Sequence, residues 1–157
     1  MPTSSATAAR AFKAAFLTAV QSVVDTSAVL VTFGHPGAQM ENWNDAISLA
    51  DVKSVQSPGP ISTNRSRNED LTLTVWISSW RLGGPEAEQT ASDAAYALLE
   101  AIEHQVRFTD TNVGNTVMWC FLTAHDSAGV TPDELLDRGR TIEIEATFTA
   151  RVRITGA

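Results

Sequence analysis

The closing segment of the chain alternates strictly between apolar and polar side chains over residues 141–155, which read TIEIEATFTARVRIT. Alternation with a period of two predicts a strand that has one buried face and one polar face. A strand of roughly 15 residues exceeds the usual 3–10, so we expect it to project past its neighbours or to bend. The pattern therefore predicts that this strand belongs to a sheet with other elements packed against one of its two faces.

A second alternating run opens at Asn68 or Glu69 and predicts another long strand. Its two faces separate cleanly into an apolar set (Leu71, Leu73, Val75, Ile77) and a more polar set (Thr72, Thr74, Trp76, Ser78). Shorter strands are predicted at 28–33 and 46–52. Residues 117–124, VMWCFLTA, are apolar on both faces, which is typical of a central strand covered on two sides.

Two segments have helical spacing of apolar side chains. Residues 8–24 place Phe12, Phe16, Val20 and Val23 on one stripe, and Thr7 is suited to cap the first turn. Residues 85–106 begin with a proline, and their expected buried face consists of Ala91, Ala95, Leu98 and Ile102.

The order of these elements predicts an α+β fold, with a largely antiparallel (mixed) sheet of about five strands packed by two helices. The length of 157 residues suits a single domain, which we place at 7–157 after a flexible lead at 1–6. Two long connections are expected. One is the loop 53–67, and the other covers 125–140 and includes a short helical turn near 132–136.

Composition excludes several classes of function. Eleven Lys and Arg against eighteen Asp and Glu give a net charge of −7, which disfavours tight, non-specific binding to nucleic acid. No apolar run approaches the ~20 residues of a membrane helix, and the N-terminus does not resemble a secretory signal. The single cysteine, Cys120, cannot form an internal disulfide, so synthesis in the cytosol is the simplest interpretation.

No catalytic, cofactor or metal site is predicted. His125, Asp126 and Ser127 are triad residue types, but a triad is assembled from separate elements, and we interpret them as a polar loop after a strand. Cys120 is expected to be a small core residue, with burial raising the pKa of its thiol. The histidines lack the spacing of metal ligands, and no glycine run matches a nucleotide-binding loop.

Charged and aromatic side chains instead suggest an interaction surface. The polar face of the closing strand is acidic at one end and basic at the other, which suits contact with a second copy around a ring. Arg65, Arg67 and the adjacent Glu69 form a mixed-charge junction between loop and strand. Each of these groups has the alternative of being simply solvated. The candidate subunit or tube interface comprises Trp43, Arg65, Arg67, Glu69, Glu143, Glu145, Arg151 and Arg153.

The order of motifs over residues 8–155 resembles the tail terminator (tail completion) proteins of long-tailed bacteriophages. The matching features follow one another along the chain: an N-terminal helix, VLVTFG-HPG, AISLADV, a Pro/Ser/Arg loop, NEDLTLTVWISSWRLGGPEAEQ, an alanine-rich helix and RGRTIEIEATFTARVRI. Arg67-Asn68-Glu69-Asp70 corresponds to the charged segment that precedes the long strand in that family.

The resemblance implies a structural role with no enzymatic activity. Such proteins form a ring, expected to be a hexamer, that caps the head-proximal end of the tail tube, stops its polymerisation and offers a surface to the head-side connector. The implied partners are further copies of the chain, the tube protein and the connector or stopper protein. DNA would pass non-specifically through the lumen, in the virion tail or neck, after assembly in the host cytoplasm. Another neck protein (head closure or head-tail connector) and a small α+β enzyme or ligand-binding domain remain alternatives.

Overall fold

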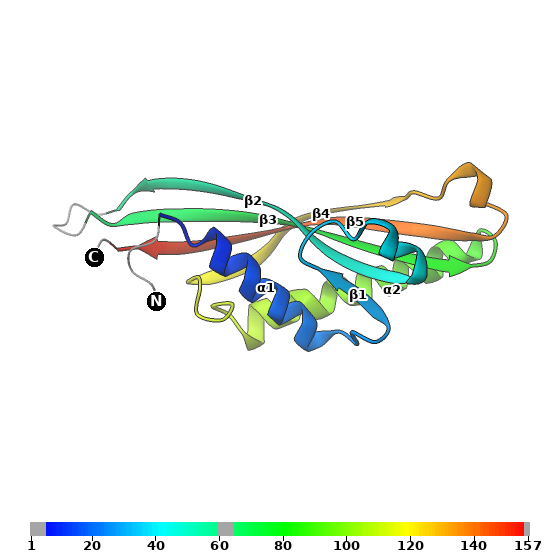
Figure 1. The fold of residues 1–157 in the computed structure, drawn as a ribbon, viewed down its shortest axis with the longest axis horizontal. Coiled ribbons are helices and arrows are strands. Elements are labelled where there is room, and N and C mark those ends of the chain that lie inside the picture. Colours follow the sequence, from blue (N-terminus) through cyan, green and yellow to red (C-terminus); the bar gives the residue numbers. More distant parts are fainter. Residues whose placement is uncertain (1–5, 60–64, 156–157) are drawn as a thin grey trace.

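The alternating segments form the inner strands of one five-stranded sheet with the order β1-β2-β3-β5-β4 (Figure 1). The computed structural model describes residues 6–59 and 65–155. The strands are β1 (Val29–Thr32), β2 (Asp45–Pro58), β3 (Arg67–Leu82), β4 (Trp119–Gly129) and β5 (Gly139–Ile154). β1 is parallel to β2, and the other neighbouring pairs are antiparallel. The predicted α+β fold with a mixed, mostly antiparallel sheet is confirmed.

Both main helices lie on the same side of the sheet (Figure 1). They are α1 (Ala9–Val23) and α2 (Glu86–His104). A π-helical turn, η2 (Gln105–Thr109), continues α2, and two short 3-10 turns, η1 (Gly37–Asn42) and η3 (Asp133–Leu135), belong to the connections. The turn expected near residues 132–136 is therefore present as η3.

The hydrophobic core fills the space between the helices and the sheet. Phe16 of α1 is fully buried, and its ring centroid lies 5.9 Å from that of Phe12 and 5.0 Å from that of Phe148 on β5. The apolar sets of the two alternating strands face this layer, as predicted. The core residues on β3 and β5 are Leu71, Leu73, Val75, Ile77, Ile142, Ile144, Ala146, Phe148, Ala150, Val152 and Ile154.

The buried stripe of α2 differs in one position from the prediction. Leu99 is fully packed, whereas Leu98 is only partly buried at the margin of the core. The stripe continues from Ala87 in steps of four residues through Ala91 and Ala95 to Leu99, so the better-packed leucine is the one that keeps this spacing.

We call the opposite side of the sheet the open face. It carries the outward side chains Thr72, Thr74 and Trp76 of β3, the alternate residues 143–153 of β5, and Trp119 and Phe121 of β4. Of the short turns, η1 reaches this face. His35, Pro36 and Met40 border a cavity of about 340 Å³ there, together with Ala46, Ser48, Trp76, Ser78 and Glu143.

Both expected long connections are shorter than predicted, because strands extend into them. β2 continues to Pro58, so only the end of the expected loop 53–67 connects β2 to β3, and its residues 60–64 lie outside the described residues. β4 continues to Gly129, which places His125 and Asp126 in a strand and not in a polar loop. The expected lead at 1–6 also lies outside the described residues, apart from Ala6.

β4 is an edge strand and not a central one. It pairs with β5 on one side only, and from Thr123 to Gly129 all its residues are exposed. The segment 117–124 was expected to be covered on both faces, but only one of its two apolar faces is covered in the protomer. Cys120 and Leu122 face the core, whereas Phe121 lies on the open face with 45% of its surface exposed.

Candidate subunit interface

The polar side chains of β5 form a two-signed stripe along the open face. Glu145, Arg151 and Arg153 are exposed and Glu143 is partly buried. Glu145 and Asp126 of β4 are cross-strand partners, so the acidic end includes side chains from two strands. The basic end gains Lys53, which is cross-strand to Thr72 next to the Asp70–Arg151 pair. The acidic and basic groups therefore gather at opposite ends of one surface.

Arg151 is partly neutralised inside the protomer. Its Nε lies 2.7 Å from Oδ1 of Asp70, and its Nη2 lies 3.2 Å from Oδ2, so the guanidinium binds the carboxylate with two parallel bonds. The hydrogen bond from Arg151 lowers the pKa of Asp70 below its ordinary value. Both side chains are about half exposed, at 48% and 41%, so solvent screens this pair and it contributes little to stability.

Aromatic rings extend the basic end of this surface on the free side of β4. The rings of Trp119 and Phe121 lie 5.4 Å apart, and the Arg151 guanidinium lies 5.8 Å from the centre of the Trp119 ring. A cation near an aromatic face is attracted by the negative charge density of the ring. The structure thus adds to the interface an aromatic group that the sequence analysis had placed in a covered central strand.

Glu69 has a role within the protomer that the sequence did not reveal. It is 0% exposed, and its Oε2 accepts a 2.9 Å hydrogen bond from the Ala8 amide at the start of α1. Oε1 accepts from the Ser54 hydroxyl at 2.6 Å, from Gln56 Nε2 at 3.4 Å and from the Thr7 hydroxyl. The carboxylate therefore joins the N-terminus of α1 to β2 and β3.

The pKa of Glu69 reflects this environment. Burial on its own raises the pKa of a carboxyl, because it disfavours the charged form. The hydrogen bonds from Ala8, Ser54, Thr7 and Gln56 together outweigh burial, so the pKa of Glu69 lies below its usual 4.5. A negative charge at a helix N-terminus is also favoured by the helix dipole. The N-cap residue of α1 is Ala8 and not Thr7 as predicted, although the Thr7 hydroxyl accepts from the Ala9 amide at 3.1 Å.

The remaining candidates lie at the two ends of the sheet. Arg65 is exposed and has a positive φ of 46°, and Arg67 donates from Nη2 to the Ala6 carbonyl at 3.3 Å. Trp43 is partly buried directly after η1. The neighbouring Asn44 carbonyl accepts from the Trp80 amide at 2.7 Å, so Trp43 belongs to the acidic end of the sheet, away from the two arginines.

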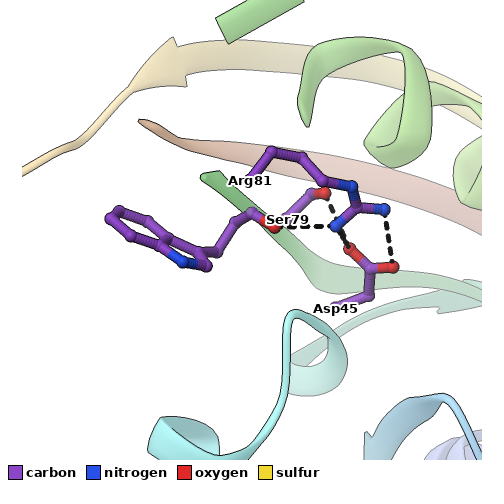
Figure 2. Close-up of polar contacts among 4 residues, drawn as sticks. Asp45, Ser79 and Arg81 are labelled. Atoms are coloured by element: carbon purple, nitrogen blue, oxygen red, sulfur yellow. Dashed lines mark hydrogen bonds and ion pairs between the residues drawn. The ribbon is translucent and has the colours of Figure 1, made fainter. Parts of the chain in front are cut away.

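A polar cluster at the start of β2 was also missed by the sequence analysis (Figure 2). Asp45 accepts from Arg81 through both oxygens, at 2.8 and 3.1 Å, and from the Ser79 hydroxyl at 2.7 Å. Asp45 and Ser79 are cross-strand partners. Asp45 lies more than thirty positions from Ser79 and Arg81 in sequence, so only the register of β2 against β3 reveals the cluster.

The described residues do not assemble the chemistry of an active site. His125 packs its ring 5.5 Å from Tyr96 on the helix side, while Asp126, the next residue of the strand, points to the open face. Burial raises the pKa of Cys120 to about 12, which keeps its thiol protonated near neutral pH. Within the described part of the chain, no group of three or more His, Cys, Asp or Glu is placed to hold a metal ion. None of the helices in residues 6–59 and 65–155 combines the length and the apolar character that a bilayer span requires.

Comparisons with known proteins identify solved structures that have a similar fold. No family model matches the sequence, and no curated protein matches it. A chain from the virion of a native gene transfer agent particle superposes with a TM-score of 0.58 at 16% identity, covering 95% of this chain and 99% of that chain. The sheath/tube terminator of PVC, an extracellular contractile injection system, in its extended state gives a TM-score of 0.49 at 12% identity, covering 100% of this chain and 58% of that chain. The chain therefore shares its fold with a component of a virion.

Proposed function

We propose that this protein is a non-enzymatic structural component of a phage-like virion. In this role it forms a ring, most simply a hexamer, on the head-proximal end of the tail tube, ends tube polymerisation and presents a surface to the head-side connector. The observation that carries the proposal is the likeness in fold, over nearly the full length of both chains, to a chain of the gene transfer agent virion. The finer assignment as a terminator rests on the order of sequence motifs.

The charge pattern of the open face supports assembly into a ring. A ring is built from head-to-tail contacts, in which one surface of each copy meets a different surface of the next. Glu143 and Arg151 are eight residues apart on one strand, or about 26 Å at about 3.3 Å per residue, so they cannot pair within a protomer. The acidic end of one copy and the basic end of the next are complementary, and such complementarity fixes the relative placement of partners.

The same charges suit the other partners in the proposal. The tube protein and the connector or stopper protein would contact the two rims of the ring. Trp43 and Arg65, at opposite ends of the sheet, are further candidate contact residues of the assembly. DNA would pass the lumen without specific contacts, because a chain with a net charge of −7 offers phosphates little attraction. The protein would then reside in the tail or neck of the particle, after assembly in the host cytoplasm.

The test is a charge exchange between the two ends of the stripe. We expect native mass spectrometry at high protein concentration, or in the presence of purified cognate tubes, to detect a closed ring. Arg153→Glu removes the net positive charge of the basic end and should weaken assembly. Glu145→Lys should weaken it too, because it leaves Glu143 and Asp126 opposed by one new ammonium group at the acidic end. An equimolar mixture of the two variants should assemble better than either variant alone, because alternating copies place opposite charges at positions 145 and 153 in every contact.

Arg10→Glu is the matched control, since Arg10 is exposed on α1 and the net charge changes by the same amount as in Arg153→Glu. This variant should assemble like the unmodified protein. A protein that remains monomeric at high concentration and also fails to bind tube ends would overturn the proposal. Binding to the head connector without binding to tubes would instead favour another neck protein.

A further inference from the structure

The sheet has two long stretches of unpaired strand edge in the described part of the chain. On one side, β4 pairs with β5 and its other edge is free over Trp119–Gly129. On the other side, β1 pairs only with Asp45–Ser48 of β2, so the outer edge of β2 is free from Leu49 to Pro58. Unpaired backbone groups along an edge are a template for pairing with another strand.

The directions of the strands make these two edges compatible with each other. β2, β3, β5 and β4 are each antiparallel to the next, so β2 and β4 run in opposite directions at opposite borders of the sheet. A second copy placed beside the first in the same orientation would bring its β2 against β4 as an antiparallel pair. The alternating pattern of the sheet would then continue across the junction.

The register also places matching side chains at the same level on both edges. Lys53, Thr72, Thr149 and Phe121 form one row across β2, β3, β5 and β4. The next row on the same face starts with Val55 on β2 and ends with Trp119 on β4. Val55 is 61% exposed, although it is apolar, and Phe121 is 45% exposed. Each free edge therefore carries an apolar side chain that the protomer does not cover.

We propose that the free edge of β4 in one copy pairs with the free edge of β2 in the next copy, and that this junction closes the ring. The inference rests on the proposed ring function, but it replaces the acidic-to-basic contact as the junction, because copies placed side by side set like ends of the stripe at the same level. Placed without a shift along the strands, Phe121 lies opposite Lys53 and Trp119 opposite Val55. The pairing is limited to Trp119–Leu122 against Val52–Val55, because at the level of Asp126–Gly129 the outer edge of β2 is already paired with β1. The Lys53 ammonium is then available to the face of an aromatic ring, and Val55 is covered by the indole.

A second copy is the occupant that the geometry favours over an unrelated strand. The side chains that would meet at the junction all belong to this one chain, on its two free edges. They lie in the same cross-strand rows and on the same face of the sheet. Pairing with an unrelated peptide would not require this match. Edge strands that must stay unpaired usually carry Lys or Pro, and β4 has neither between Trp119 and Gly129. The free edge of β2 carries Lys53 and Pro58, and in the proposed junction Lys53 lies opposite an aromatic ring.

Disulfide trapping tests the junction directly. The double variant Val55→Cys, Trp119→Cys should give a ladder of covalent oligomers on oxidation, ending at the ring size, in non-reducing gel electrophoresis. Each single variant should give no ladder, because the native Cys120 is buried. A dimer from either single variant would indicate a two-fold contact and overturn the proposal, as would a double variant that assembles but does not cross-link.

A charge exchange tests the edge pairing separately from the proposed ring function. Phe121→Lys places two ammonium groups opposite each other and should reduce ring formation at least tenfold, and adding Lys53→Glu should restore it. Leu82→Lys, at the most exposed leucine and at the far end of β3, is the control and should assemble normally. Rings that form equally well with Phe121→Lys would leave the proposed function standing and refute the edge pairing. Cross-linked open filaments would support the edge pairing and refute the closed ring.

Discussion

Replacement of Glu69 by glutamine should destabilise the protomer more than a surface substitution of the same kind. Glutamine has nearly the same shape, but it removes the charge and puts an amide donor where the carboxylate accepts. The carboxylate receives hydrogen bonds from Ala8, Ser54, Gln56 and Thr7, and it has no contact with solvent. At least one of these donors would lose its acceptor in Glu69→Gln.

The expected size of the effect follows from these contacts. A buried donor left without a partner costs about 1–3 kcal/mol, and a charge at a helix N-terminus contributes about 0.3–1 kcal/mol. We therefore expect Glu69→Gln to lower the free energy of unfolding by about 2 kcal/mol. For a domain of this size that corresponds to a decrease in Tm of about 4–8 °C. Glu100→Gln, at an exposed position of α2, should change the free energy of unfolding by less than about 0.5 kcal/mol.

The effect should also depend on pH in a defined direction. Because the pKa of Glu69 in the folded state is lower than its usual 4.5, its charge stabilises the fold above pH 4.5. That stabilisation is lost as the pH falls through the folded-state pKa, so the difference between the native protein and Glu69→Gln should shrink in acid. Urea unfolding at pH 7 and pH 3 measures it. A Glu69→Gln protein as stable as Glu100→Gln, or a difference that is equal at both pH values, would refute this account.

Two further substitutions and one labelling experiment test the core and a polar cluster. Arg81→Lys should lower the free energy of unfolding by about 1 kcal/mol in urea titrations, because lysine cannot bind both oxygens of Asp45 at once. Phe16→Ala should cost about 3–5 kcal/mol by the same measurement, since it empties the space between Phe12 and Phe148. Cys120, whose pKa burial raises to about 12, should react with a thiol reagent at pH 8 only slowly in the native protein and fully after denaturation.

The two long alternating strands and both helices could be predicted from the sequence because they follow a single physical rule. Each buries one face against the same core, and so the spacing of apolar side chains matches the geometry of a strand or a helix. β3 and β5 keep this spacing along nearly their whole length, as their buried residues show. The fold class follows from the order of such elements and needs no knowledge of distant contacts.

The second half of β2 could not be predicted because its core-facing side chains are polar. Ser54 and Gln56 face the helix side of the sheet, where apolar residues would be expected, and both donate to Glu69. The sequence of this segment, KSVQSP, therefore lacks the alternation that marks a half-buried strand. Its structure depends on a carboxylate in the next strand and on the N-terminus of α1, which are far away in sequence.

The position of β4 at the edge of the sheet was predicted wrongly for the opposite reason. Its first residues are apolar on both faces, which is typical of a central strand. A segment that is apolar on both faces is either covered on both sides in the protomer or covered later by a partner. Cys120 is covered by the core, whereas Phe121 is largely open to solvent. The proposed junction between copies would cover the side chains that the protomer leaves exposed.

The strands of this sheet are longer than its hydrophobic core requires. At the N-terminus of α1, the ends of β2 and β3 are held by the hydrogen bonds of Glu69 and by the Asp70–Arg151 pair, beside the buried side chains of Leu71 and Val152. These contacts do not cover the edges of β2 and β4 or the open face with other elements. They hold the strands in register, so the exposed side chains stay in rows across the sheet. In the proposed ring, the parts of the strands that add little to the hydrophobic core supply the surface through which copies contact each other. The same carboxylate would thus support both the docking of α1 and the geometry of the junction, which is why Glu69→Gln should impair assembly at protein concentrations where the protomer is still folded.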